Sequence, residues 1–291
     1  MSIPNYKKTR IAPTPSGFLH LGNVLSFSIT AALAQKHGAK ILLRIDDLDQ
    51  ARANDQYLQD IFDTLNFLEI PWDEGPRDVN EFKNTYSQVH RIGLYNETLE
   101  DLRARRRIFA CTCSRQQLRD NIPCACRDKN ILLNEKDASW RLIADDQAEL
   151  NVKDYSGQII HAALPGDIHN FIVRRKDGLP SYQLTSVVDD LHYGVDLIIR
   201  GQDLWSSTVA QHELANTLHK GDFHAITFYH HPLLVEPDGQ KLSKSDGATS
   251  VRYLRQSGKA PVDIYRMISA SLGINAEINS WQQLANTLIT T

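Results

Sequence analysis

A histidine near the start of the chain has the chemistry to contact a phosphate. His20 lies in the Gly- and Pro-containing stretch PSGFLHLGN, where Gly17 and Gly22 leave room for a ligand to approach the backbone. The first amides of the helix that follows favour an anion, and His20 can donate a hydrogen bond to a phosphate oxygen. A histidine in such a turn often serves only as a local hydrogen-bonding residue, so this stretch alone leaves both roles open.

Two lysines near the other end of the chain have related chemistry. Lys241 and Lys244 belong to GQKLSKSDG, a serine-rich stretch with a glycine at each end, which predicts a loop. Two ammonium groups on one loop can stabilise negative charge on a polyphosphate during a reaction. A solvated pair of surface lysines has the same pattern, so the lysines by themselves do not decide between the two roles.

The cysteines suggest a metal site of a different kind. All four lie within residues 111–126, as Cys111, Cys113, Cys124 and Cys126. Two Cys-x-Cys pairs offer four thiolates, which suit tetrahedral zinc, although two to four intervening residues are more usual. We expect structural zinc here, and four reduced thiols in a small apolar cluster are the alternative.

Composition limits the classes of protein to consider. The chain has 291 residues, of which 42% are hydrophobic, enough for a large domain with an insertion or for two domains. The formal net charge of −3 excludes a polycation that wraps nucleic acid. Any nucleic-acid site must be local, and the basic runs at residues 103–107 and 173–176 could contact phosphates or form solvated surfaces.

The start of the chain has neither the apolar run of a signal peptide nor that of a membrane span. The first thirty residues lack a continuous apolar segment of the required length, and no later stretch is long and apolar enough to span a bilayer. We therefore expect a cytoplasmic protein without a membrane partner.

Alternating strand and helix patterns predict an α/β fold with a doubly wound parallel sheet. In such sheets ligands bind beyond the carboxyl ends of strands, where residues 13–22 and 46–49 would lie. An irregular polar stretch at residues 130–165 predicts an insertion, with short strands at 139–144 and 158–164. The main strand patterns are at residues 7–12, 40–45, 171–175 and 196–201, and the helical patterns at 23–38, 57–65, 85–107, 181–194 and 262–273.

The two phosphate-contact candidates together resemble a known pair of motifs. HLGN near the start and KLSKS near the end are similar to the paired signature of class I aminoacyl-tRNA synthetases. The resemblance narrows to the glutamyl group of that family and covers most of residues 10–250. The chain length resembles truncated members that keep the catalytic and acceptor-side parts and lack the anticodon-binding domain. The stretches that carry it, in the family's order, are RIAPTPSGFLHLGN, LLRIDDLD, PWDEGP, LPSYQLTSVVDD, LIIRGQDL and YHHPLLVEPDGQKLSKS.

This resemblance implies a division of the chain. Residues 1–98 and 171–232 would be the two halves of a Rossmann-like catalytic domain. Residues 99–170 would be an inserted acceptor-side domain that carries the cysteines. Residues 233–291 would hold the KLSKS loop and a short helical C-terminal segment.

The resemblance also implies the site residues. It assigns the glutamate pocket to Arg10, Thr14, Asp46, Tyr182 and Arg200, and contacts with ATP to Pro13, His20, Gly22, Asn23, Lys241 and Lys244. Of these, His20, Lys241 and Lys244 would be catalytic, because they would stabilise charge on the phosphates. The chemistry agrees for glutamate: two guanidinium groups can hold a carboxylate, and an aspartate can hold the substrate's ammonium.

The implied reaction is activation of L-glutamate by ATP, with Mg²⁺ accompanying the nucleotide. The implied acceptor is queuosine at the wobble position of tRNA(Asp), with no obligate protein partner. One alternative is a minimal glutamyl- or glutaminyl-tRNA synthetase that charges the tRNA 3′ end. Another is a non-enzymatic regulator of synthetase-like fold that binds tRNA or an amino acid.

Some positions depart from the family pattern or invite another role. Asn23 replaces the last histidine of the first motif. Asp46 stands where the glutamyl group has glutamate and glutaminyl enzymes have aspartate, so the choice of amino acid rests chiefly on Arg200. Asp189 and Asp190 resemble a metal-binding pair, but we expect them to brace the loop that follows.

Overall fold

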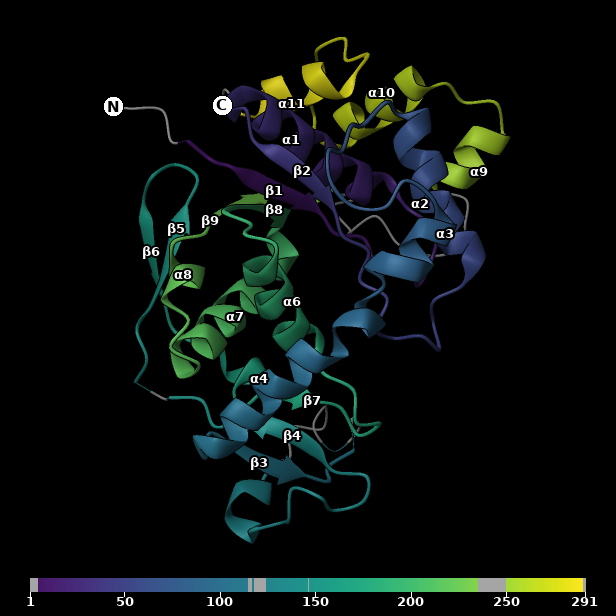
Figure 1. Cartoon of the computed structure of the whole chain (residues 1–291). Helices are drawn as coiled ribbons and strands as arrows, with labels where there is room; N and C mark the ends of the chain where they lie inside the picture. The colour runs from purple at the N-terminus through teal and green to yellow at the C-terminus, as the bar shows by residue number, and fades with distance from the viewer. Residues whose placement is uncertain (1–4, 115–116, 118–123, 146, 235–249, 290–291) are drawn as a thin grey trace. The chain divides into compact units, whose positions relative to one another are not determined.

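The chain folds into two compact units (Figure 1). The computed structural model describes residues 5–114, 117, 124–145, 147–234 and 250–289. Unit 1 consists of residues 1–90, 195–203 and 228–291, and unit 2 consists of residues 91–194 and 204–227. The division expected at residues 98, 170 and 232 remains a prediction.

Unit 1 is built on a sheet with the strand order β2-β1-β8-β9. β1 pairs in parallel with both β2 and β8, which confirms the expected α/β class. Every residue of β8 is buried, as in a central strand covered on both faces. The strands are β1 (Lys8–Ile11), β2 (Lys40–Leu43), β8 (Leu197–Gly201) and β9 (Thr227–His231).

Helix α1 (Leu21–His37) packs between the sheet and the C-terminal helices. It contacts β1, β2 and β8 as well as α10 (Pro261–Ser271) and α11 (Trp281–Ile289) (Figure 1). Its middle, from residue 27 to residue 34, is buried at every position because both faces are covered. The helix ends at Gly38, whose φ of 66° is left-handed and favours glycine.

The C-terminal segment is helical, as expected, and side chains anchor it to the end of α2 (Asp55–Phe67). The indole of Trp281 donates to the carbonyl of Glu69 at 3.0 Å. The hydroxyl of Tyr265 donates to the carbonyl of Leu68 at 2.9 Å. α9 (Val251–Gln256) begins this segment within the described residues and contacts α2.

Unit 2 contains a three-stranded antiparallel sheet in the order β3-β4-β7 and a separate β5–β6 hairpin. The strands are β3 (Ile108–Cys111), β4 (Ser139–Leu142), β5 (Leu150–Asp154), β6 (Ile159–Ala162) and β7 (Ile172–Arg174). Its helices include α4 (Ile92–Ala104), α6 (Tyr182–His192), α7 (Trp205–Thr217) and α8 (Gly221–His224). The expected strands at 139–144, 158–164 and 171–175 are found, whereas β3 and β5 have no counterpart in the sequence prediction.

The expected continuous helix over residues 85–107 is wrong. Helix α3 (Val79–Glu81) precedes the segment, which contains the end of a π-helical turn (Phe82–Tyr86), a 3-10 helix (Gln88–Arg91) and then α4. The break is at Ser87, whose ψ of 142° is not helical. The Ser87 hydroxyl and the Gln88 amide both donate to the carboxylate of Asp47, and these bonds favour the extended backbone over a helical turn.

A buried ion pair joins α4 and α6 inside unit 2. The guanidinium of Arg91, at the start of α4, donates to both carboxylate oxygens of Asp189, at 2.8 and 3.2 Å. The hydroxyl of Tyr95 donates to the same carboxylate at 2.8 Å. The side chain of Asp189 therefore connects two helices rather than bracing the loop that follows α6.

Replacing one partner of this pair is expected to destabilise the protein strongly. Asp189→Asn leaves the Arg91 charge buried without its counter-ion, which typically costs about 3–5 kcal/mol. Asp177→Asn is the matched control, because the pair between Asp177 and Arg175 is partly exposed, and about 1 kcal/mol or less is expected. Urea denaturation measures both free energies of unfolding, and equal losses in the two variants would contradict this assignment.

Candidate active site and cysteine cluster

The parallel pairing of β1 and β2 continues beyond the two strands and joins the segments expected to bind substrate. The Arg44 amide donates to the carbonyl of Ile11 at 2.9 Å, and the Asp46 amide donates to the carbonyl of Pro13 at 2.9 Å. The carboxyl ends of both strands therefore lie together, with the segments that begin at Pro13 and Asp46 side by side.

Two buried arginines lie on neighbouring strands of this sheet. Arg10 is on β1 and Arg200 is on β8, with 7% and 4% of their surfaces exposed. The Arg10 guanidinium donates to the carbonyl of Ile199 at 3.3 Å, next to Arg200 in the chain. The Arg200 guanidinium lies 5.0 Å from the ring centre of Phe228. Two buried guanidinium groups on neighbouring strands favour an anionic ligand, because attraction between opposite charges is stronger where water is excluded.

Asp46 already has a cationic neighbour. Arg44 donates from Nε and Nη2 to the two carboxylate oxygens of Asp46, at 2.7 and 3.0 Å, and both residues are buried. This two-point contact fixes the orientation of the carboxylate. Each carboxylate oxygen can accept a further hydrogen bond, so the pair is compatible with a substrate ammonium group.

The sequence analysis missed the role of the next residue, Asp47. Its carboxylate accepts hydrogen bonds from the Ser87 hydroxyl at 2.6 Å, the Gln88 amide at 2.8 Å and the Gln50 side chain at 2.9 Å. These bonds hold the loop after β2 against residues 87 and 88 and so restrain its neighbour Asp46. The doubled aspartate in LLRIDDLD was the available signal.

The other two residues implied for glutamate, Thr14 and Tyr182, belong to different units. Thr14 is exposed and follows Pro13 in unit 1. Tyr182 belongs to unit 2, where it is the first residue of α6 and is 43% exposed.

His20 is the N-cap residue of α1, and Asn23 completes a capping box. The Gly22 amide donates to Nδ1 of His20 at 3.2 Å, and the His20 amide donates to Oδ1 of Asn23 at 3.0 Å. Because Nδ1 accepts a hydrogen bond, the neutral ring carries its proton on Nε2, the state needed to donate to a phosphate. A Cβ atom on Gly22 would lie 3.1 Å from the His20 ring, so glycine here leaves space for that ring.

The structure brings the chain just after the KLSKS stretch against the HLGN stretch. The Val251 amide donates to the carbonyl of Leu19 at 2.8 Å, and His20 forms a β-bridge with Ser250. Both segments belong to unit 1 although they are far apart in the sequence. Lys241 and Lys244 lie outside the described residues.

Charged side chains of α2 and α9 stabilise the contact between Leu19 and Val251. The Leu19 amide donates to Oδ2 of Asp60 at 3.1 Å, and Arg255 lies 3.6 Å from Oδ1 of the same carboxylate. Burial raises the pKa of Asp60, and the Leu19 amide and Arg255 only partly counteract it. Arg252 of α9 lies 4.6 Å from the ring centre of Phe18. The sequence analysis did not identify these residues as supports of the HLGN stretch.

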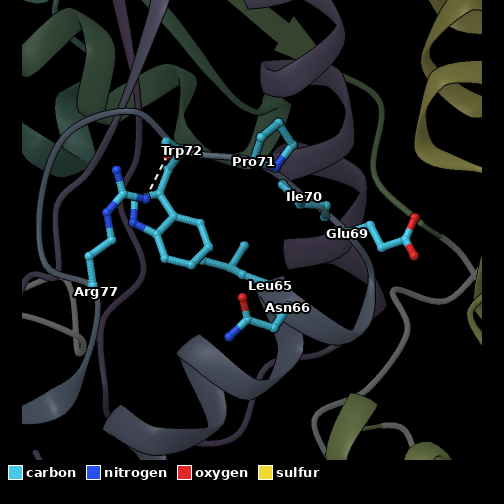
Figure 2. A pocket seen from close by; sticks show the side chains of 7 residues that line it. All are labelled: Leu65, Asn66, Glu69, Ile70, Pro71, Trp72 and Arg77. Atoms are coloured by element: carbon cyan, nitrogen blue, oxygen red, sulfur yellow. Dashed lines mark hydrogen bonds between the residues drawn. The ribbon is translucent and has the colours of Figure 1, made fainter.

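A cavity in unit 1 lies apart from the residues implied by the motifs. It has a volume of about 420 Å³ and is lined by Leu65, Asn66, Glu69, Ile70, Pro71, Trp72 and Arg77 (Figure 2). The Arg77 guanidinium lies 5.2 Å from the centre of the Trp72 ring and donates to the carbonyls of Trp72 and Asp73. These contacts stabilise the loop that lines the cavity, and none of the residues implied for glutamate or ATP lines it.

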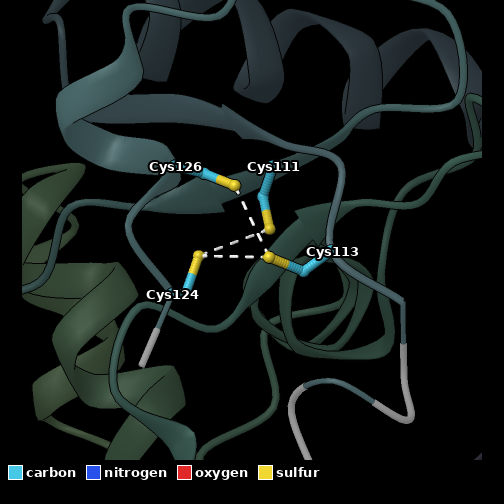
Figure 3. A group of neighbouring side chains, drawn as sticks. All are labelled: Cys111, Cys113, Cys124 and Cys126. Atoms are coloured by element: carbon cyan, nitrogen blue, oxygen red, sulfur yellow. Dashed lines mark hydrogen bonds between the residues drawn. The ribbon is translucent and has the colours of Figure 1, made fainter. Parts of the chain in front are cut away.

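The four cysteines form a compact cluster in unit 2 (Figure 3). Their sulfur atoms all lie within 4.8 Å of one another, with Cys113 at 3.5 Å from Cys126 and 3.8 Å from Cys124, and Cys111 at 3.6 Å from Cys124. Four zinc–sulfur bonds of about 2.3 Å in a tetrahedron place the sulfurs about 3.8 Å apart. The cluster could therefore hold a metal ion of that size and geometry.

Without a metal the thiols differ in acidity. Burial raises the pKa of Cys113 to about 12, and hydrogen bonds that Cys113 donates to the neighbouring thiols act in the same direction. Burial also raises the pKa of Cys126, but a backbone hydrogen bond from Thr112 and bonds with the other thiols outweigh it and lower the pKa to about 7. A metal that binds all four thiolates must therefore displace protons.

The parallel sheet and the contact of residues 250 and 251 with the HLGN stretch agree with a class I aminoacyl-tRNA synthetase architecture, and so does comparison with known proteins. Residues 7–284 match the family described as tRNA synthetases class I (E and Q), catalytic domain. The chain belongs to this family, whose members are ligases. A solved glutamate tRNA ligase from Elizabethkingia meningosepticum superposes with a TM-score of 0.71 at 21% identity, over 96% of this chain and 64% of that one.

Curated relatives fall into two named groups. A protein named glutamyl-Q tRNA(Asp) synthetase from Symbiobacterium thermophilum is 34% identical over 273 residues, which cover 87% of this chain and 82% of that protein. A protein named glutamate–tRNA ligase 2 from Nitrosococcus oceani is 31% identical, with 87% of this chain and 57% of that protein covered. The chain thus matches most of the first relative and little more than half of the second.

None of the helices in the described part of the chain is both long enough and apolar enough to cross a bilayer.

Loss of the Asp60 carboxylate is expected to loosen the junction at Leu19. Asp60→Ala leaves the buried Leu19 amide without its acceptor, which costs about 1–3 kcal/mol of the free energy of unfolding. Asp63→Ala, one turn later on α2, is the control, because Asp63 forms only a partly exposed pair with Arg255 and an exposed hydrogen bond with Gln59, and its loss should cost about 1 kcal/mol or less. Urea denaturation tests this, and a smaller loss for Asp60→Ala than for Asp63→Ala would disprove the assignment.

Proposed function

We propose that the protein activates L-glutamate with ATP and transfers the glutamyl group to queuosine at the wobble position of tRNA(Asp). The observation that carries the activation step is the pair of buried arginines on neighbouring strands of unit 1, the unit that also contains the HLGN stretch. Family membership supports the ligase chemistry. The queuosine acceptor is supported by the names of relatives, which include proteins from Symbiobacterium thermophilum and Nocardia farcinica.

Arg10 and Arg200 are assigned to the acidic side chain of the substrate. Burial strengthens the attraction of the two guanidinium groups for a carboxylate. Glutamine lacks that charge, so it would gain none of this attraction. Asp46, oriented by Arg44, is assigned to the substrate's ammonium group, and Thr14 and Tyr182 are assigned hydroxyl contacts with glutamate.

The activation step needs positioning and charge stabilisation and no covalent bond to the protein. A carboxylate oxygen of glutamate forms a bond to the α-phosphorus of ATP while the bond from that phosphorus to the bridging oxygen breaks and pyrophosphate leaves. His20, with its proton on Nε2, would donate to a phosphate oxygen, and Lys241 and Lys244 would stabilise the leaving charge. Pro13, Gly22 and Asn23 would lie against the nucleotide, and Mg²⁺ bound to ATP would supply further positive charge.

In the transfer step, a hydroxyl of queuosine attacks the carbonyl carbon of the glutamyl-adenylate. AMP leaves, and the hydroxyl proton is lost to solvent or to the leaving phosphate. The second candidate acceptor is the tRNA 3′ end, favoured by the match to glutamate–tRNA ligases.

Glutamate-dependent exchange between ATP and pyrophosphate tests the activation step. The native protein should catalyse exchange with glutamate and much less with glutamine. Lys244→Ala should nearly abolish it.

Arg200→Met should lower kcat/KM for glutamate by roughly thirty- to several-thousand-fold, the equivalent of about 2–5 kcal/mol. Arg266→Met, an exposed arginine paired with Glu277, should leave exchange unchanged, and no exchange by the native protein would favour a regulator.

The acceptor is tested with labelled glutamate and four purified tRNAs. These are tRNA(Asp) and tRNA(Glu), each prepared from cells with and from cells without the pathway that makes queuosine. Label should appear only in tRNA(Asp) that carries queuosine, and nuclease digestion should recover it on the wobble nucleotide. Label at the 3′ terminal adenosine, or transfer to unmodified tRNA(Glu), would instead establish the second candidate.

We also propose that the cysteine cluster binds one structural zinc ion. Elemental analysis should find about one zinc per chain, and Cys113→Ser should lose most of it, whereas Thr112→Ser should keep it. Because the thiol pKa values of Cys113 and Cys126 lie at about 12 and about 7, binding releases protons, and the zinc affinity should fall as the pH is lowered below 7. Equal zinc content in the two variants would rule out this site.

A further inference from the structure

A second cavity is lined by residues of unit 2 alone, and its lining includes no cysteine and no residue assigned to glutamate or ATP. Its volume is about 520 Å³, within the range of small-molecule sites. The end of α4, the start of β3, the loop after β4 and the end of α7 supply its walls. The lining residues are Arg105, Arg107, Asp145, Ala148, Glu213, Asn216, Thr217 and His219.

Glu213 is the unusual member of this lining. Only 1% of its surface is exposed, and its Oε1 accepts a hydrogen bond from the Asp145 amide at 3.0 Å. Its Oε2 is buried and has no hydrogen-bond partner among the described residues. A buried acceptor without a donor is costly, so an acidic side chain at this position needs a ligand to compensate it.

Donors lie in the same cavity. Arg107 donates from Nη2 to the carbonyl of Ile143 at 3.1 Å, and its buried Nε has no hydrogen-bond partner among the described residues. Arg105 is exposed and pairs with Asp101 at 2.8 Å. The cavity therefore combines a buried acceptor with two guanidinium groups, in the basic run at residues 103–107.

We propose that this cavity binds one unpaired nucleotide of the RNA substrate, with an exocyclic amino group of its base donating to Glu213 and its phosphate contacting Arg105 and Arg107. Proteins read single-stranded RNA through the hydrogen-bonding edges of unstacked bases, and arginine is well suited to phosphate. Cytosine, adenine and guanine carry such an amino group, and uracil does not. The inference rests on the proposed function in one respect, that the substrate is an RNA.

Binding of short RNAs to the full-length protein tests this assignment. Fluorescence anisotropy would measure the affinities of fluorescein-labelled pentacytidylate and pentauridylate for the native protein. Pentacytidylate should bind about tenfold more tightly, as expected for one hydrogen bond to a carboxylate worth about 1.4 kcal/mol. Glu213→Gln has nearly the same shape and should remove that preference, because its amide can donate to uracil as well as accept from cytosine.

The phosphate contact is tested separately. Arg107→Ala should weaken binding of both RNAs to a similar extent and reduce the slope of affinity against salt concentration by about one. Arg103→Ala is the matched control, because Arg103 belongs to the same basic run but pairs with Glu100 and does not line the cavity. Its effect should be less than twofold.

Two results would overturn the inference: equal affinity of the native protein for the two RNAs, or a preference that survives in Glu213→Gln. Thermal unfolding of each variant shows whether a change in affinity reflects misfolding. ATP–pyrophosphate exchange with glutamate should be the same in Glu213→Gln as in the native protein. Exchange without the RNA preference would refute only the cavity assignment, whereas the RNA preference without exchange would refute only the activation step.

Discussion

The parallel pairing of β1 with both of its neighbours is the constraint on which the candidate active site depends. It places Arg10 beside the strand that carries Arg200, and its continuation past the end of β1 joins Pro13 to Asp46. These contacts are backbone hydrogen bonds in a buried sheet, so they hold the positions of the side chains with little freedom.

Buried charge is compensated locally in each unit. In unit 1 the carboxylate of Asp46 is held by Arg44, and the carboxylate of Asp60 by the Leu19 amide and Arg255. In unit 2 Asp189 is held by Arg91 and Tyr95. Glu213 differs from Asp60 because, among the described residues, it forms no ion pair and accepts a hydrogen bond at only one of its two oxygens. That difference is why Glu213 is assigned to a ligand and Asp189 to the packing of two helices.

The sequence predictions were correct where structure depends on residues close together in the sequence, and wrong where it depends on contacts between distant residues. Strands such as residues 40–45 and the helix beginning near Asn23 were predictable, because hydrophobic periodicity and capping signals are local. The continuous helix over residues 85–107 was wrong because the carboxylate of Asp47, distant in the sequence, takes the donors of Ser87 and Gln88. Likewise, nothing adjacent to Asp60 in the sequence indicates that it accepts from Leu19.

The sequence by itself determined the α/β class, the family motifs and the presence of four closely spaced thiols, since each depends on residue types at short spacing. Tertiary structure alone decided that Val251 bonds to Leu19, that the four sulfur atoms lie within 4.8 Å of one another, and that Glu213 lines a buried cavity. The physical reason is that these contacts join segments separated by many residues, and no local pattern specifies which distant donor meets which acceptor.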